Sequence, residues 1–465
     1  MQFIENRTFD EIKLGESAEL TRTLKTADIE LFAVMSGDVN PAHVDQEYAH
    51  SDMFHKVIAH GMWGGALISA VLGTELPGPG TIYLNQNLKF LRAVGLGDTV
   101  TIRVTVTAKD AAQHHVTLAC LCTNQNGETV IEGEAIVVAP TAKVRRPRVV
   151  LPEVHLHERG SRFADLINAT SSLAPVRTAV VHPCDAASLK GALEAGEKGI
   201  IIPVLVGPQA KIEAAAQDAG CDLTGIEIID VPHSHAAAEQ AVALARAGKV
   251  DMLMKGKIHT DELLKPALDK VTGLRTERRM SHIFALDVPT YPKLLLISDA
   301  AINIFPDLSA KRDIVQNAID LAIALGIDLP KVALLSAVET VTSSLPSTVD
   351  AAALCKMADR GQITGGLLDG PLAFDNAISK IAAEAKGIIS DVAGQADILI
   401  VPDLNSGNMI AKQLIYLAGA DAGGVVVGAR VPIILTSRAD GVLSRIASAA
   451  MAQLMAHAAH PAPIL

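Results

Sequence analysis

From about residue 175 onward, the chain alternates short apolar runs with longer alanine-rich stretches. The clearest apolar runs are Ile201–Gly207, Ile226–Asp230, Asp251–Met254, Leu294–Ile297, Val332–Leu335 and Ile398–Val401. This rhythm predicts parallel β-strands joined by crossover helices. Polar residues follow several of the runs, and in open α/β sheets ligands bind at the carboxyl ends of the strands. The sequence has neither a Walker A motif nor G-x-G-x-x-G, so nucleoside triphosphates and dinucleotides are poor candidate ligands.

The first 140 residues follow a different pattern. A helix start is predicted at Thr26–Glu30, and a small-residue apolar segment covers about Gly61 to Leu72. Strand-like runs follow at Thr99–Val106, His115–Cys122 and Glu134–Val138, and the first of them alternates polar and apolar residues. This order predicts a central helix wrapped by an antiparallel sheet that has one covered face.

The segment from Pro140 to about Gly160 is rich in Pro, Arg, Lys and His and shows no period, which is typical of a linker. We therefore expect a domain at residues 1–140, a linker at 141–160 that includes the basic cluster Arg145–Arg148, and a second domain at 161–465.

Composition and charge narrow the class of function. The net charge of −11 across 465 residues argues against a nucleic-acid partner, which would need clustered Lys and Arg. Five cysteines show no metal-binding spacing and fit a reducing compartment. The N-terminus lacks a signal-peptide pattern, and the two uncharged runs, at residues 57–74 and 446–465, are too poor in large apolar residues to be convincing membrane spans. We expect a cytoplasmic protein without a membrane or nucleic-acid partner.

Candidate acid/base chemistry lies near the N-terminus. Asp38 and His43 are five residues apart across an Asn-Pro turn, so a carboxylate and a neutral imidazole can converge on one water molecule. Asn40 can fix either the turn or that water. The amide of Gly61, at a helix start, can donate to a developing oxyanion, so the predicted site needs no metal. The alternative is a tight turn in which these side chains only cap backbone groups.

Most of residues 10–138 resembles the MaoC-like, (R)-specific enoyl-CoA hydratase family. The matching text is Ser36-Gly37-Asp38-x-Asn40-Pro41-x-His43-x-Asp45, Ile58-x-His60-Gly61-Met62 and Pro77-Gly78-x-Gly80-Thr81-Ile82-Tyr83-Leu84. The resemblance implies a hot-dog fold, usually dimeric, that hydrates trans-2-enoyl-CoA to (R)-3-hydroxyacyl-CoA. It also implies that Asp38 and His43 are the catalytic pair.

Three polar segments in the second half follow predicted strands, and we expect them to converge on one cleft. The first, Lys255-Gly256-Lys257, combines cations with free amides at a helix start, where an anion can bind. The second contains Ser406 and Asn408, and the third contains Ser437 and Arg438. Taken one at a time, each segment also has a structural interpretation. The two lysines can be solvated, Ser406 can cap a helix, and Arg438 can pair with Asp440 on the surface.

Together these segments resemble the phosphate acetyl/butyryltransferase family, from about residue 162 to the C-terminus. The supporting text is Gly273-Leu274-Arg275-Thr276, Met280-Ser281-His282, Ser298-Asp299-Ala300-Ala301-x-Asn303, Pro402-Asp403-Leu404-Asn405-Ser406-Gly407-Asn408 and Thr436-Ser437-Arg438. The resemblance implies two α/β subdomains with a cleft between them and acyl exchange between CoA and phosphate. A guanidinium such as Arg438 suits bidentate phosphate binding, and Ser437 can hydrogen-bond the phosphate or the thiol.

The sequence departs from the family pattern at two positions. Lys265 stands where the family usually carries a phosphate-binding Arg, which keeps the charge but loses the planar fork. Ser444 stands where the acetyl branch tends to have an Asp as candidate base, so either the base is absent or Asp440 substitutes for it.

The sequence therefore predicts a bifunctional acyl-CoA enzyme. Its predicted catalytic residues are Asp38, His43, Ser437 and Arg438, and its predicted substrate-binding residues are Asn40, Gly61, Lys257, Lys265, Ser406 and Asn408. CoA thioesters, acyl phosphate and phosphate are the expected substrates, with no permanently bound cofactor or metal, and a homo-oligomer is expected. In the alternative, the second domain is a non-catalytic, acyl-CoA-sensing and oligomerising module attached to a hydratase.

Overall fold

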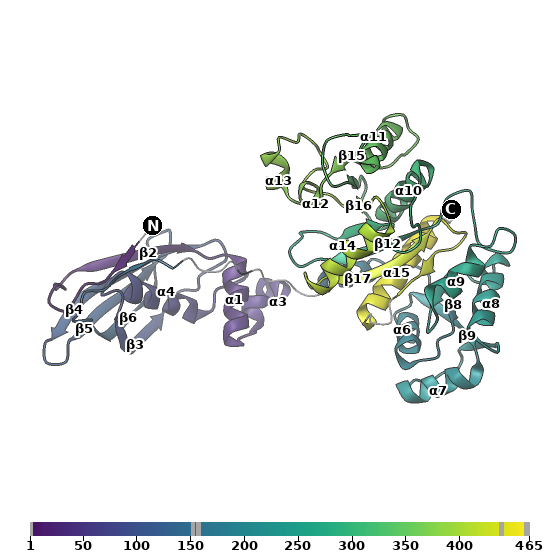
Figure 1. Ribbon diagram of the computed structural model, residues 1–465. Coiled ribbons are helices and arrows are strands. Elements are labelled where there is room, and N and C mark those ends of the chain that lie inside the picture. Colours follow the sequence, from purple (N-terminus) through teal and green to yellow (C-terminus); the bar gives the residue numbers. More distant parts are fainter. Residues whose placement is uncertain (1–2, 150–153, 155–159, 437–440, 460–465) are drawn as a thin grey trace. The chain divides into compact units, whose positions relative to one another are not determined.

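The computed structural model describes residues 3–149, 154, 160–436 and 441–459 (Figure 1). The chain forms two compact units, Met1–Leu156 and His157–Leu465. None of the helices in these ranges combines the length and the hydropathy that a membrane span requires.

The N-terminal unit is a five-stranded antiparallel sheet with strand order β2-β4-β5-β6-β3 and a helix packed on one face (Figure 1). The predicted alternation is confirmed in β4, where Val100, Ile102, Val104 and Val106 are buried. The predicted central helix is α4, whose Ile68, Val71 and Leu72 pack into the same core. This is the hot-dog arrangement. The strands are β2 Ser17–Thr23, β3 Ile82–Phe90, β4 Thr99–Asp110, β5 His115–Thr123 and β6 Thr129–Val138; the helices are α1 Thr26–Ser36, α2 Pro41–Val44, α3 Gln46–Ser51 and α4 Gly61–Thr74.

Part of the predicted linker belongs to the N-terminal unit. Arg145–Pro147 form strand β7, which pairs antiparallel with β1 (Phe3–Glu5). Lys143 donates a hydrogen bond to the main-chain oxygen of Asn6. The assignment of the Arg145–Arg148 cluster to the linker is therefore wrong for residues 145–147, because the pairing strand lies about 140 residues away and local composition cannot reveal it.

The C-terminal unit is built on a mixed sheet in which the described residues contribute eleven strands, in the order β10-β9-β8-β11-β18-β17-β12-β13-β16-β14-β15. All six predicted apolar runs are strands of this sheet. The strands are β8 Val176–Val181, β9 Ile201–Gly207, β10 Glu227–Asp230, β11 Met252–Lys255, β12 Ser281–Asp287, β13 Leu295–Ser298, β14 Lys331–Leu335, β15 Leu367–Leu372, β16 Ile398–Ile400, β17 Asp421–Val427 and β18 Ile433–Ile434.

Helices cover both faces of this sheet (Figure 1). The last helix, α15, which contains part of the uncharged run at residues 446–465, buries Ile446, Ala447 and Ala450 in the core of the unit. The helices are α5 Ser161–Asn168, α6 Ala186–Glu197, α7 Gln209–Ala219, α8 Ser234–Arg246, α9 Thr260–Ala267, α10 Leu308–Ala324, α11 Pro346–Asp359, α12 Phe374–Ile378, α13 Lys380–Ala385, α14 Leu404–Tyr416 and α15 Val442–Ala459.

The alternation of strands and helices predicts parallel strands. The sheet is instead mixed. Strands β10-β9-β8-β11-β18 form one parallel block and β13-β16-β14-β15 form another, whereas β17 and β12 run antiparallel to their neighbours between the blocks. The segment between β12 and β13 is only seven residues long and contains no helix, so it joins antiparallel strands.

This topology places several strand ends in one row. Paired residues cross the middle of the sheet in the order Met254, Ile434, Val425, Ile283, Ser298 and Ile400. Strands β11, β18, β13 and β16 all end within one residue of this row. The polar segments that follow them therefore start close to strand β12, even though the two parallel blocks run in opposite directions.

Candidate functional sites

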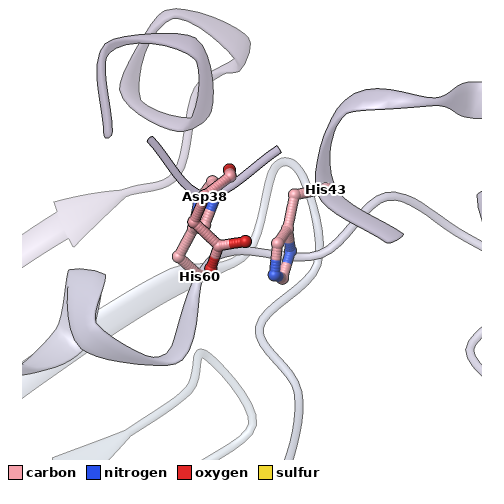
Figure 2. Close-up of side chains that lie close together, drawn as sticks. All are labelled: Asp38, His43 and His60. Atoms are coloured by element: carbon pink, nitrogen blue, oxygen red, sulfur yellow. Dashed lines mark hydrogen bonds between the residues drawn. The ribbon is translucent and has the colours of Figure 1, made fainter. Parts of the chain in front are cut away.

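The first site gathers Asp38, His43 and His60 in the N-terminal unit (Figure 2). One ligand-type atom from each of these side chains lies within 4.8 Å of the others. Asp38 lies in the turn between α1 and α2, His43 lies on α2, and His60 is the residue that precedes α4. The predicted pair of Asp38 and His43 is thus brought together, with a third residue for which sequence reasoning gave no role.

The hydrogen bonds of His43 indicate its tautomer. Its Nδ1 lies 2.9 Å from the main-chain oxygen of Ile58. Because a carbonyl oxygen can only accept, Nδ1 carries the proton and Nε2 is left as an acceptor in the neutral ring. An imidazole held in this way is ready to take a proton from a water molecule.

Asn40 and Asp38 shape the turn that holds this pair. The Asn40 side chain accepts a hydrogen bond from the Ala42 amide at 3.2 Å and so caps α2, while Asp38 Oδ1 accepts from the Asn40 amide at 3.2 Å. Of the two predicted roles of Asn40, the geometry supports fixing the turn. The capping contacts of the alternative interpretation are therefore present, and they hold the turn between Asp38 and His43.

His60 contacts both members of the pair. It is only 2 % exposed, and its Nε2 donates to the main-chain oxygen of Asp38 at 3.0 Å. Its ring lies 4.0 Å from the His43 ring, centroid to centroid, and 4.8 Å from the Phe32 ring. Its Nδ1 is buried and has no hydrogen-bond partner among the described residues. The signal for His60 was present in the Ile58-x-His60-Gly61-Met62 motif.

A cavity of about 310 Å³ opens beside these side chains. His43, His60 and Gly61 line one part of it, and the remaining walls are mainly apolar, including Trp63 and Phe90. Gly61 is the first residue of α4, where a backbone amide has no partner within the helix. The predicted oxyanion donor therefore lines the same cavity as His43, whereas Asp38 is not among the lining residues.

The three side chains also form a potential metal-ligand set, but their geometry fits an acid/base pair better. A metal lies in the plane of each imidazole that binds it, so two histidine ligands must direct their ring planes at one point. The His43 and His60 rings instead face each other with an interplanar angle of 35°.

The second site lies in the C-terminal unit, around the end of β18. Lys255, the last residue of β11, is 5 % exposed and donates from Nζ to the Thr436 main-chain oxygen at 3.3 Å. Arg445 of α15 is 4 % exposed and donates to Thr436 Oγ1 at 2.9 Å. Two buried cations thus converge on the residue that precedes the predicted catalytic pair. Ser437 and Arg438 themselves lie outside the described residues.

A cavity of about 340 Å³ adjoins this cluster. Its polar lining includes Lys255, Thr436 and His282 and, from α14, Asn408 and Lys412. Apolar side chains complete it, namely Ile258, Phe284, Ala301 and Leu435. Cations beside an apolar wall suit a ligand that combines a phosphate with an acyl group.

The other predicted binding residues are placed differently. Lys257 is exposed and does not line this cavity, although Lys255 from the same motif does. Lys265 is exposed in the last turn of α9. Asn408 lines the cavity and donates to the Ala300 main-chain oxygen at 3.2 Å.

Ser406 lies beside a separate cavity on another face of α14, and it bonds to Asp403 through both its amide and its hydroxyl, each at 2.9 Å. Ser406 thus lies in the first turn of α14, whose capping residue is Asp403 and not Ser406 as the alternative predicts.

Asp299 shapes the turn that follows β13. It is 2 % exposed, and its carboxylate accepts hydrogen bonds from the amides of Ala301, Ile302 and Asn303. Burial raises the pKa of Asp299 in spite of these donors. The turn brings Ala301 to the wall of the cavity. Asp299 therefore acts on the site through the backbone.

Comparisons with known proteins agree with this division of the chain. Residues 10–124 match the model of the MaoC like domain, and residues 234–453 match that of phosphate acetyl/butaryl transferase. A phosphate acetyltransferase from Rhizobium meliloti is 62 % identical over 296 residues, which cover 64 % of this chain and 94 % of that protein.

Solved structures are also similar to each unit. A branched-chain phosphotransacylase from Enterococcus faecalis V583 is 29 % identical, with a TM-score of 0.53, over 61 % of this chain and 99 % of that one. An R-hydratase from Pseudomonas aeruginosa is 42 % identical over 33 % of this chain and 99 % of that one, with a TM-score of 0.33.

Proposed function

Because this chain belongs to the phosphate acetyl/butyryltransferase family and carries a MaoC-like domain before it, we propose that it is a bifunctional acyl-CoA enzyme. The C-terminal unit transfers an acyl group, acetyl in the first instance, reversibly between CoA and phosphate. The N-terminal unit adds water to trans-2-enoyl-CoA to give (R)-3-hydroxyacyl-CoA, or catalyses the reverse dehydration.

The observation that best supports the acyltransferase function is the cationic cluster at the end of β18. It lies in a unit that is 62 % identical to a phosphate acetyltransferase. Lys255 and Arg445 both donate hydrogen bonds to Thr436, the residue that precedes Ser437 in the sequence. Lys255 and Lys412 supply positive charge to the cavity for a phosphate dianion. Arg438 and Ser437 are proposed to complete phosphate and thiol binding.

The hydratase function is supported by the geometry around His43. In the hydration direction, Nε2 of His43 takes a proton from water, and the oxygen of that water bonds to the β-carbon of the enoyl thioester. The Asp38 carboxylate orients the same water. The Gly61 amide stabilises the negative charge that develops on the thioester oxygen. The proton then passes to the α-carbon, which balances the addition.

We further propose that the chain forms a homo-oligomer through the N-terminal sheet. Strand β3 lies at the edge of that sheet, and its Ile82, Leu84 and Phe90 are 60 %, 48 % and 51 % exposed. Exposed apolar edge strands pair readily with a second strand. Sedimentation of the full chain tests this proposal, since a monomer at micromolar concentration would contradict it.

A paired assay on the full chain tests both activities. Hydration of crotonyl-CoA is followed by loss of enoyl absorbance, and acyl transfer by thiol release from acetyl-CoA or butyryl-CoA in the presence of phosphate. Asp38→Asn keeps the shape of the side chain but removes the charge, so we expect it to lose most of the hydration and to keep acyl transfer. Arg438→Ala should show the reverse pattern.

Two outcomes of the paired assay would contradict parts of this proposal. Near-wild-type hydration by Asp38→Asn would contradict the catalytic role proposed for Asp38. Hydration without acyl transfer in the wild-type chain would favour the alternative, in which the C-terminal unit senses acyl-CoA without turning it over.

A further inference from the structure

His282 is a buried imidazole at the acyltransferase cavity for which neither the family resemblance nor the proposed mechanism supplies a role. It lies on β12, is 2 % exposed and lines the cavity together with Lys255, Thr436 and Lys412. Its ring makes an edge-on contact with Phe284, with the ring centroids 4.5 Å apart. It therefore reaches the cavity where apolar and cationic walls meet.

A glycine on the neighbouring strand leaves room for the His282 ring. Gly424 of β17 pairs with Phe284 of β12, and a Cβ added at Gly424 would lie 2.8 Å from His282 Nε2 and 2.6 Å from the Leu435 main-chain oxygen. The imidazole thus lies across Gly424, next to the end of β18. A glycine is needed at this position because any side chain would displace the ring.

The two ring nitrogens differ in their surroundings. Nδ1 is fully buried and has no hydrogen-bond partner in the described part of the chain. A buried N–H without an acceptor is rarer in folded proteins than an acceptor without a donor. The neutral ring therefore carries its proton on Nε2, and because Nδ1 is shut away from the cavity, His282 lines the cavity with the Nε2 side of its ring.

The charged side chains that line the cavity with His282 are cations. Lys255 from β11, His259 before α9 and Lys412 from α14 line the same cavity, and Arg445 lies behind Thr436. The carboxylate of Asp299, which follows the strand paired with β12, accepts hydrogen bonds from the amides of its own turn. Burial also lowers the pKa of His282 to about 4. The imidazole is consequently a neutral hydrogen-bond donor and a poor proton acceptor.

We propose that His282, as a neutral imidazole, donates its Nε2–H to the carbonyl oxygen of the acyl group while that group passes between CoA and phosphate. The proposal rests on the acyltransferase function proposed above. The CoA sulfur forms a bond to the carbonyl carbon, and the carbonyl π electrons move onto the oxygen that Nε2–H stabilises. The electrons return as the bond to the phosphate oxygen breaks, and the thiol proton leaves with the phosphate.

Two substitutions separate this role from that of a base. His282→Gln keeps an N–H donor and cannot titrate, whereas His282→Leu removes the donor at similar volume. We expect His282→Leu to lower the kcat of acyl transfer about 100-fold or more, in line with the loss of an oxyanion donor, with the KM for phosphate nearly unchanged. His282→Gln should retain kcat within about tenfold of wild type, and no histidine ionisation should appear in the wild-type kcat profile between pH 6 and 9.

Stability distinguishes a functional role from a structural one. Because Leu removes a buried nitrogen without a partner, His282→Leu should melt no lower than wild type. Wild-type kcat in His282→Leu would overturn the proposal. Equal losses in both variants, with a wild-type ionisation that disappears in them, would make His282 a base and would also overturn it. If the wild-type chain itself transfers no acyl group, it is the proposed function that fails.

Discussion

His60→Phe tests whether His60 positions the acid/base pair of the N-terminal unit. The phenyl ring can keep the stacking on Phe32 and His43, whose ring centroids lie 4.8 and 4.0 Å from that of His60. It cannot replace the Nε2–H bond to the Asp38 main-chain oxygen. The substitution therefore removes one hydrogen bond and leaves most of the packing in place.

The expected cost follows from that single bond. A hydrogen bond between neutral groups contributes about 1 kcal/mol, and because Asp38 is exposed, water can hydrate the released carbonyl. If the lost bond is what holds the turn in its active geometry, the transition state for hydration loses about the same amount. Since 1.36 kcal/mol corresponds to tenfold in rate, we expect kcat to fall about fivefold with the KM for crotonyl-CoA unchanged.

His60→Gln is the matched control. Its amide can donate to the Asp38 carbonyl, but it lacks the ring beneath His43, an aromatic contact that contributes about 0.5–1.5 kcal/mol. Acyl transfer by the same chain reports on general damage, because it takes place in the other unit. Wild-type hydration kinetics in His60→Phe would refute the positioning role, as would a fall in acyl transfer that matches the fall in hydration.

Two further predictions concern the C-terminal unit. The pKa of His282 is about 4 in the folded chain and 6.5 in the reference state, so the unfolded chain binds this proton more tightly and stability falls as the pH drops from 6.5 towards 4. Between pH 7 and 5 this group should cost roughly 2 kcal/mol of unfolding free energy, and denaturant titrations should show a correspondingly smaller loss in His282→Leu. In Gly191→Ala, the added Cβ would lie 2.6 Å from Arg445 Cδ, so the Arg445 side chain must shift, and we expect this to weaken its hydrogen bond to Thr436. We expect about tenfold slower acyl transfer with normal hydration, and unchanged transfer would show that the Arg445 contact is dispensable.

Local sequence patterns determined much of the architecture. The alternation in residues 99–106 is enough to place Val100, Ile102, Val104 and Val106 on one buried face, because side chains along a strand alternate between its two faces. The apolar runs of the second half became strands for a similar reason, since only short, strongly apolar segments can lie under helices on both faces. The turn from Asp38 to His43 could also be predicted from the sequence, because Asn and Pro fix its backbone locally.

Strand direction and the composition of the sites were decided by tertiary structure. The pattern of apolar runs does not show that β12 and β17 run antiparallel between two parallel blocks, yet this register places the ends of β11, β18 and β13 in one row. Lys255 lines the cavity while Lys257 does not, although both belong to one motif. The sequence also gave no sign that Arg445, on the helix after Thr436, would donate a hydrogen bond to the Thr436 side chain.

The two histidines without predicted roles show where sequence reasoning ends. His60 and His282 both belong to recognisable motifs, but the contacts on which their proposed roles rest involve residues remote in sequence, Asp38 in one case and Gly424 in the other. The sequence by itself determined which elements form and which residues are candidates for chemistry, because periodicity, caps and turns act over a few residues. Tertiary structure decided which side chains share a cavity, because that depends on strand register and on packing between distant segments.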